Sequence, residues 1–245
     1  MNRCAFLLLV AALAMVPAAF AAPGSSAVTA PQTELQQRDD KVLLTEAGAV
    51  FKQVLDMPEN IPQELLEKAR CVIVMPSVLK AAIIVGGSWG RGAMLCRTGR
   101  DFSGAWGAPA MYMLEGGSLG YQFGGEAIDF VILVMNDRGL DSLVNSKVKL
   151  GAGASIAAGP VGRTATADTD AMLHSEMLSY SRSRGIFAGI SLEGAILQPD
   201  DDANRRLYGN DASTRAIIAK PAAEAPEAAR PLVTRLQEAA PQLKP

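Results

Sequence analysis

The chain has 245 residues, of which 49% are apolar, and its formal net charge is −2 at neutral pH. This length and apolar content suit one globular domain with a sizeable core and additional terminal segments. Basic residues are not in excess and are not interleaved with aromatic residues, so the composition argues against nucleic-acid binding.

The N-terminus has the pattern of a bacterial secretory signal peptide. Arg3 precedes an apolar run, and Ala19, Phe20 and Ala21 form an A-x-A cleavage site. The run is too short for a membrane-spanning helix. We therefore expect a periplasmic or secreted protein, either free or associated with the membrane. The expected parts of the chain are a signal peptide at 1–22, a flexible lead at 23–38, a folded domain at 39–219 and a disordered Ala- and Pro-rich tail at 220–245.

Two helices are expected at the start of the domain. Residues 41–57 repeat apolar side chains at spacings of three and four, and Asp39 or Asp40 offers an N-terminal cap. Residues 61–70 predict a second, shorter helix with Pro62 in its first turn.

After these helices, the sequence changes to short aliphatic segments separated by Gly and Pro, which predict strands from residue 71 onward. A short helix or turn is expected at 136–146, a hairpin at 147–167 and a last pair of strands around residues 183–185. The closing segment, 201–219, predicts turns and a helix. Helices followed by many strands favour an α+β fold with an antiparallel sheet, sandwich or barrel-like, rather than alternating βαβ units.

The stretch Gly86 to Gly90 spells G-x-S-x-G around Ser88, the pattern of a hydrolase nucleophile elbow, and the chain has one histidine, His174. An elbow needs a helix after the serine, whereas WGRGAML contains two glycines, which disfavour a helix. The same pattern recurs at 116–120. We therefore expect glycine-rich strands and no enzyme, and serine hydrolysis is the least favoured function. The sequence indicates no cofactor and no metal-ligand spacing.

Cys71 and Cys96 remain after removal of the signal peptide, and both lie in predicted strands. In an oxidising compartment they can form a disulfide. The alternative is a pair of small buried thiols.

Four long segments resemble the SYLF domain, a family also described as lipid-binding or yeast actin-binding. They extend over about residues 43–209 and read IPQELLEKARCVIVMPSVLKAAIIVGGSWGRG, GAPAMYMLEGGSLGYQFGGEAIDFVILVMN, KVKLGAGASIAAGPVGR and YSRSRGIFAGISLEGAILQPDDDANRRLYG. The resemblance implies a non-catalytic phospholipid-binding domain, with phosphoinositide binding and actin bundling in eukaryotic members. Since we expect a bacterial envelope protein, we expect anionic phospholipids or a membrane surface as the partner and do not expect actin. The oligomeric state is left open.

In lipid-binding members of the SYLF family, an amphipathic helix at the start of the domain inserts into the membrane beside basic residues. The matching helix here is 41–57, and it has few basic residues. Its apolar face either inserts in lipid or packs on the sheet. This face consists of Leu43, Ala47, Val50, Phe51 and Val54.

Basic residues elsewhere offer a cationic surface for headgroups. Those expected to contribute are Lys80, Arg91, Lys147, Lys149, Arg182 and Arg184. The alternative is that they lie on solvated sheet faces. A further alternative function is a module that binds a protein or a glycan in the cell envelope.

Overall fold

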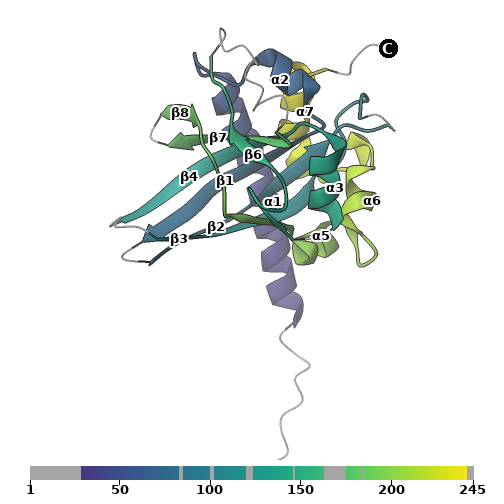
Figure 1. Ribbon diagram of the computed structural model, residues 1–245. Helices are drawn as coiled ribbons and strands as arrows, with labels where there is room; N and C mark the ends of the chain where they lie inside the picture. Colours follow the sequence, from purple (N-terminus) through teal and green to yellow (C-terminus); the bar gives the residue numbers. More distant parts are fainter. Residues whose placement is uncertain are drawn as a thin grey trace, which may run out of the picture.

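The structure is a computed structural model with an α+β fold (Figure 1). It describes residues 29–82, 85–99, 102–119, 124–145, 147–162, 175–183 and 185–241. The expected signal peptide, His174 and Arg184 lie outside these residues. In the described part of the chain, nine strands form a single curled sheet.

The strands follow the glycine-punctuated aliphatic segments of the sequence. They are β1 (Cys71–Ala82), β2 (Val85–Cys96), β3 (Ala110–Leu119), β4 (Gly124–Val134), β5 (Val148–Lys149), β6 (Ile156–Ala158), β7 (Met177–Ser183), β8 (Ile186–Gly189) and β9 (Ile196–Pro199). Their order in the sheet is β5-β9-β3-β2-β1-β4-β7-β6, and β8 pairs with β7. All of these pairs are antiparallel except β6 with β7. The expected α+β class with a mainly antiparallel sheet is therefore confirmed.

One expected strand pairing is wrong. Within the described residues 147–162, the two strands do not form the expected hairpin, because β5 pairs with β9 and β6 pairs with β7. A local alternation of small residues did not reveal that both short strands complete the edges of a larger sheet. The expected pair around 183–185 is correct, since β7 and β8 are antiparallel neighbours and Gly185 has a φ of 83°.

The helices lie on both faces of the sheet. They are α1 (Thr29–Leu55), α2 (Gln63–Lys68), α3 (Asp137–Asn145), α5 (Asp201–Tyr208), α6 (Thr214–Ile218) and α7 (Arg230–Ala239), with single-turn 3-10 helices η1 (Ala222–Glu224) and η2 (Glu227–Ala229). Figure 1 shows α1 crossing the sheet and projecting beyond it at its N-terminal end.

Two predicted boundaries are corrected. The helix begins at Thr29 rather than near Asp40, so residues 29–38 of the expected flexible lead are helical. A proline is tolerated in a first helical turn, and the residues after Pro31 are mostly good helix formers. Most of the expected disordered tail is also folded, because α7 packs against α1.

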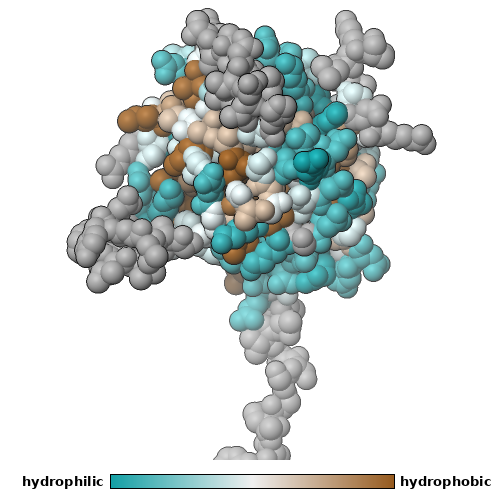
Figure 2. All heavy atoms as spheres, viewed as in Figure 1, coloured by the Kyte–Doolittle hydropathy of each residue, from teal (hydrophilic) through white to brown (hydrophobic). Residues whose placement is uncertain are grey.

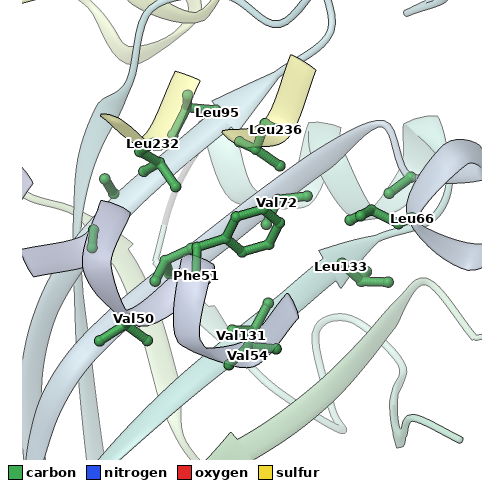
Figure 3. Packing of buried hydrophobic residues seen from close by; sticks show 14 of the residues in the cluster. Val50, Phe51, Val54, Leu66, Val72, Leu95, Val131, Leu133, Leu232 and Leu236 are labelled. Carbon is green, nitrogen blue, oxygen red and sulfur yellow. The ribbon is translucent and has the colours of Figure 1, made fainter. Parts of the chain in front are cut away.

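Two apolar clusters fill the space on the two faces of the sheet. The first lies between the sheet and the helices α1 and α7, and Phe51 is at its centre (Figure 3). The second lies on the opposite face and includes buried residues of α3 and α6. We call these the α1 face and the α3 face of the sheet. Consecutive residues of a strand point to opposite faces, which explains the aliphatic runs: both faces are buried here.

Arg97, at the end of β2, fixes the C-terminal helix. Its buried guanidinium stacks on Trp106 at 4.5 Å and donates to the carbonyls of Ala240 and Pro241, each at 3.1 Å. Burial lowers the pKa of Arg97. Because this cation is bonded by carbonyls at the end of α7, it stabilises the docking of a segment that the composition predicts to be disordered.

Candidate functional site

β1 contains one extra residue relative to both of its neighbours. The pairs Met75–Phe130 and Val78–Ile128 enclose two intervening residues on β1 but only one on β4. Pro76 cannot donate to a ladder, and Ser77 adopts a φ of 49° while its N–H donates to the Asp129 carboxylate at 2.9 Å. This β-bulge shifts the alternation by one residue, so every side chain after it points to the opposite face from that expected.

Glycines make room for the bulge. A side chain on Gly92 would overlap the Val74 carbonyl and Met75, and one on Gly90 would overlap Val78. These two glycines belong to the G-x-S-x-G stretch and the residues after it. Their spacing therefore serves the close approach of β2 to the bulge rather than a nucleophile.

Ser88 itself lies within β2, which continues to Cys96 without a helix. Its hydroxyl donates at 3.5 Å to the carbonyl of Gly116 on β3, in the second copy of the pattern. The strand-to-helix turn that exposes a hydrolase nucleophile is not present at Ser88. The described part of the second copy, 116–119, instead lies beside the first copy in the neighbouring strand.

Beyond the bulge, the α1 face of the sheet carries exposed apolar side chains. Leu79 and Trp89 are directly paired on β1 and β2 and are 56% and 50% exposed. Val42 on α1 is 50% exposed. We call these three residues the apolar strip. The strip is unusual because most other large apolar side chains of the described residues are buried.

The apolar strip lines a groove between α1 and the sheet. The groove has a volume of about 280 Å³. Its sheet wall includes Pro76, Leu79 and Trp89, and its helix wall includes Val42 and Leu43. Two exposed carboxylates on α1, Asp39 and Glu46, also line it, as does Arg91 on the sheet side. We call this the α1 groove.

Asp40 holds α1 against the sheet and α5 beside the groove. Its carboxylate is fully buried and accepts hydrogen bonds from Arg91 at 2.5 Å and from Arg206 at 2.7 Å. Arg91 also donates to Asp200 at 2.7 Å. Burial acts to lower the pKa of Arg91, but its hydrogen bond to Asp40 and the charge of Asp200 outweigh burial and raise it. The two carboxylates and two guanidiniums thus form a neutral cluster, which we call the Asp40 cluster. Its members are Asp40, Asp200, Arg91 and Arg206.

The five predicted basic residues that the structure describes do not form one cationic surface. Arg91 is engaged in the Asp40 cluster, and Arg182 donates to Asp129 at 3.0 Å. Lys80 points to the α3 face, where its ammonium lies 5.3 Å from the Phe130 ring centroid. Lys147 and Lys149 are exposed at β5, several strands away from Lys80.

The predicted apolar helix face is largely inside the protein. Ala47, Phe51 and Val54 are fully buried, Val50 is 7% exposed and Leu43 is partly buried. Of the two interpretations left open by the sequence, packing on the sheet is the one the structure shows. Figure 3 shows Phe51 beside Val72 and Val54 beside Val131 of the strands, with Leu232 and Leu236 of α7 on the other side of Phe51. This face is therefore not available to insert into lipid while α1 remains docked.

Cys71 and Cys96 form a disulfide, the bridge that the sequence left open. They are direct partners on the antiparallel strands β1 and β2, with a Cα–Cα distance of 4.0 Å. The bridge lies at the covered end of the sheet, next to Arg97, and far along both strands from the apolar strip.

The site residues that sequence reasoning missed are those of the apolar strip and its acidic neighbours. Strict alternation from Val72 and Val74 would place Lys80 on the α1 face and Leu79 on the opposite face. The dipeptide Pro76-Ser77 within an aliphatic strand was the available signal, because proline in a strand marks an edge or a bulge. Figure 2 shows, on the face in view, hydrophobic residues gathered over the strands and hydrophilic residues over α3 and α6.

Comparison with known proteins identifies the family. The family model for Ysc84, described as "Las17-binding protein actin regulator", matches residues 115–239. The SH3 domain-containing protein PJ696.02 of Schizosaccharomyces pombe is 38% identical over 184 residues, which is 74% of this chain and 42% of that protein. The protein YSC84 of Saccharomyces cerevisiae is 32% identical over 191 residues, 77% of this chain and 40% of that protein.

Vertebrate relatives match as well. The SH3 domain-containing YSC84-like protein 1 of Xenopus laevis is 34% identical over 152 residues, 62% of this chain and 44% of that protein. The fold and site thus define a SYLF-type α+β domain. The chain belongs to the Ysc84 family, which confirms the SYLF resemblance, and it spans less than half the length of these relatives.

The family description corrects one expectation about partners. We expected actin not to be a partner, but the family is described as an actin regulator, and one curated relative is named LAS seventeen-binding protein 3. Excluding actin on the basis of an expected bacterial envelope location was therefore wrong. Among the residues that the structure describes, none of the helices combines the length and apolar character required to cross a membrane.

Proposed function

We propose that this protein is a non-catalytic domain that binds a phospholipid membrane surface through the apolar strip. The observation that carries the proposal is the exposure of Trp89, Leu79 and Val42, at 50%, 56% and 50%, on the sheet beyond the β1 bulge and on the adjoining helix α1. Adjacent exposed apolar side chains of this size mark interaction surfaces. Tryptophan suits a membrane interface, because its ring is apolar and its N–H is polar.

The expected contact is shallow and reversible. Fully burying a large apolar side chain contributes about 1.5–3 kcal/mol, so three half-exposed side chains contribute roughly 3 kcal/mol together. That corresponds to about a hundredfold in a binding constant. A contact of this strength suits a peripheral domain that needs a second contribution from headgroups or from further copies of the domain.

We also propose a location in the bacterial cell envelope. The N-terminal pattern of Arg3, an apolar run and Ala19-Phe20-Ala21 supports export. The Cys71–Cys96 disulfide supports an oxidising compartment. Fractionation of cells into periplasm, membranes and cytoplasm, followed by detection of the mature chain, tests this location.

Liposome flotation tests the membrane contact. Replacing Trp89 by Ala and Leu79 by Ser is expected to reduce recovery with vesicles strongly, while thermal unfolding stays unchanged. Ile186→Ser is the matched control, since Ile186 is 71% exposed but lies on β8. Equal recovery of the double variant and the wild type would remove the apolar strip from the proposal. Absence of flotation for the wild type would remove membrane binding altogether.

A second candidate function is binding a protein, including actin or an actin regulator. The family match supports it, because the matched residues, 115–239, extend from β3 to α7 and carry the description of an actin regulator. Co-sedimentation with actin filaments tests it directly. A pull-down from an envelope extract tests a different protein or glycan partner. Recovery with filaments or with one such partner, in a sample that does not float with vesicles, would favour this second function.

A further inference from the structure

The α1 groove adjoins the apolar strip and has its own chemistry. Its volume, about 280 Å³, is slightly below the range of pockets that enclose a whole small ligand. One wall is the strand pair after the β1 bulge and the other is α1. A groove of this size accommodates one end of an acyl chain and the adjoining headgroup while the rest of a lipid remains in the bilayer.

The groove carries a net negative charge. Asp39 and Glu46 are exposed on the helix wall, and neither has an ion-pair partner among the described residues. The Asp40 cluster behind the groove is neutral, with two carboxylates and two guanidiniums. Arg38 and Lys41 on the same helix do not line the groove. The two carboxylates therefore favour a cationic group near the apolar wall and disfavour an additional anion.

Arg91 offers one complementary donor for an anion. Its Nε and Nη2 atoms donate to Asp200 and Asp40, while no described residue accepts a hydrogen bond from its Nη1. Arg91 also lines the groove. The Arg91 side chain is 20% exposed, so its Nη1 is a donor available to a phosphate oxygen at the groove.

We infer that the α1 groove binds a phospholipid whose headgroup carries a primary amine, such as phosphatidylethanolamine. The ammonium group donates to the carboxylates of Asp39 and Glu46, the phosphate accepts from Arg91, and the first part of an acyl chain lies on Trp89 and Leu79. This inference rests on the proposed membrane function and names its lipid class. A headgroup with only negative charge lacks the cation that the carboxylates require, and a choline headgroup has no N–H to donate.

Flotation with three vesicle types separates the possibilities. The vesicles consist of phosphatidylcholine alone, phosphatidylcholine with phosphatidylethanolamine, and phosphatidylcholine with phosphatidylglycerol. The wild-type protein is expected to bind the ethanolamine vesicles about threefold more tightly than the other two, as suits one or two exposed ion pairs. Asp39→Asn with Glu46→Gln is expected to remove this preference and to leave binding to phosphatidylcholine unchanged.

The matched control is Glu64→Gln with Glu193→Gln, which changes the net charge equally at exposed sites that do not line the groove. The control is expected to keep the ethanolamine preference. Equal binding of the wild type to all three vesicles, or tighter binding to phosphatidylglycerol, would overturn the inference and leave the membrane function standing. No binding to any vesicle would overturn both. If the control variant also loses the ethanolamine preference, the effect is due to net charge, and the inference is likewise overturned.

Discussion

The two halves of the central part of the sheet differ in what covers them, although the same four strands, β1 to β4, form both. In the half before the bulge, α1 and α7 cover one face, and the side chains are aliphatic and buried (Figure 3). In the half after the bulge, Gly, Ala and Ser residues lie side by side, as in the row Gly125, Ala81, Gly87 and Gly117. The large apolar side chains there, Leu79 and Trp89, are exposed.

This difference shows that one sheet serves two purposes. The covered half stabilises the fold through packing and a disulfide. The open half instead presents exposed apolar side chains that do not pack in the core. Stability and binding are therefore expected to respond to different substitutions. The following predictions test this separation in order of decreasing effect on the free energy of unfolding.

The largest effect is expected in the covered half. Phe51→Ala removes a fully buried ring from the cluster between α1, α7 and the sheet. The loss of transfer free energy and the resulting cavity are expected to lower the free energy of unfolding by about 4 kcal/mol. Denaturant titration measures it. Leu35→Ala, on the 60% exposed side chain of the same helix, is the control and is expected to have little effect. A loss below about 1 kcal/mol for Phe51→Ala would contradict the packing described.

Loss of the disulfide is expected to have the next largest effect. Replacing Cys71 and Cys96 together by Ser opens a link between positions 25 residues apart. The chain-entropy relation gives about 3.5 kcal/mol for a loop of that length. The unfolding midpoint should fall equally in the double variant and in reduced wild-type protein. If reduction leaves the wild-type midpoint unchanged, the bridge does not form in solution.

Disruption of the Asp40 cluster is expected to have the third largest effect on stability. Asp40→Asn leaves Arg91 and Arg206 without their shared carboxylate in a buried position. Removing one partner of a buried ion cluster costs about 3 kcal/mol. Its neighbour Asp39 is exposed, so Asp39→Asn is the matched control and should stay within about 0.5 kcal/mol of the wild type in denaturant titration. Similar losses for both variants would mean that the cluster contributes nothing specific.

The smallest effect on stability is expected in the open half. Trp89→Ala, at a 50% exposed side chain, should change the free energy of unfolding by less than about 1 kcal/mol. The same variant is expected to lose most of its recovery with vesicles. A large loss of stability would show that Trp89 belongs to the core, and the comparison between the two halves would fail.

The amino-acid sequence predicts the elements better than their surroundings. Glycine-punctuated aliphatic runs reveal the strands, and the spacing from Leu43 to Val54 reveals the buried stripe of α1. Periodicity does not say what an apolar helix face contacts. The sequence alone therefore does not distinguish insertion of the α1 face in lipid from its packing on the sheet. The composition of the C-terminal segment also misleads, because Leu232 and Leu236 pack on α1 despite the surrounding Ala and Pro residues.

The candidate site was harder to predict because it depends on long-range geometry. Arg91 resembles a free cation in the sequence, yet its partners Asp40 and Asp200 are 51 and 109 positions away. The exposure of Trp89 depends on where α1 crosses the sheet, and no local sequence pattern predicts that position. The fold class and the family resemblance, in contrast, rest on signals spread over most of the chain.

The extra residue in β1 links the fold to the way such a gene can change. Deletion of the single codon for Ser77 would restore regular pairing with both neighbouring strands. It would leave Leu79 paired with Trp89 and Lys80 paired with Glu126, so both side chains would keep their present faces. Loss of the bulge without a deletion would instead place Lys80 on the α1 face and Leu79 on the opposite face, because strict alternation would then continue along β1. The bulge therefore decides which of these two neighbouring side chains lines the groove.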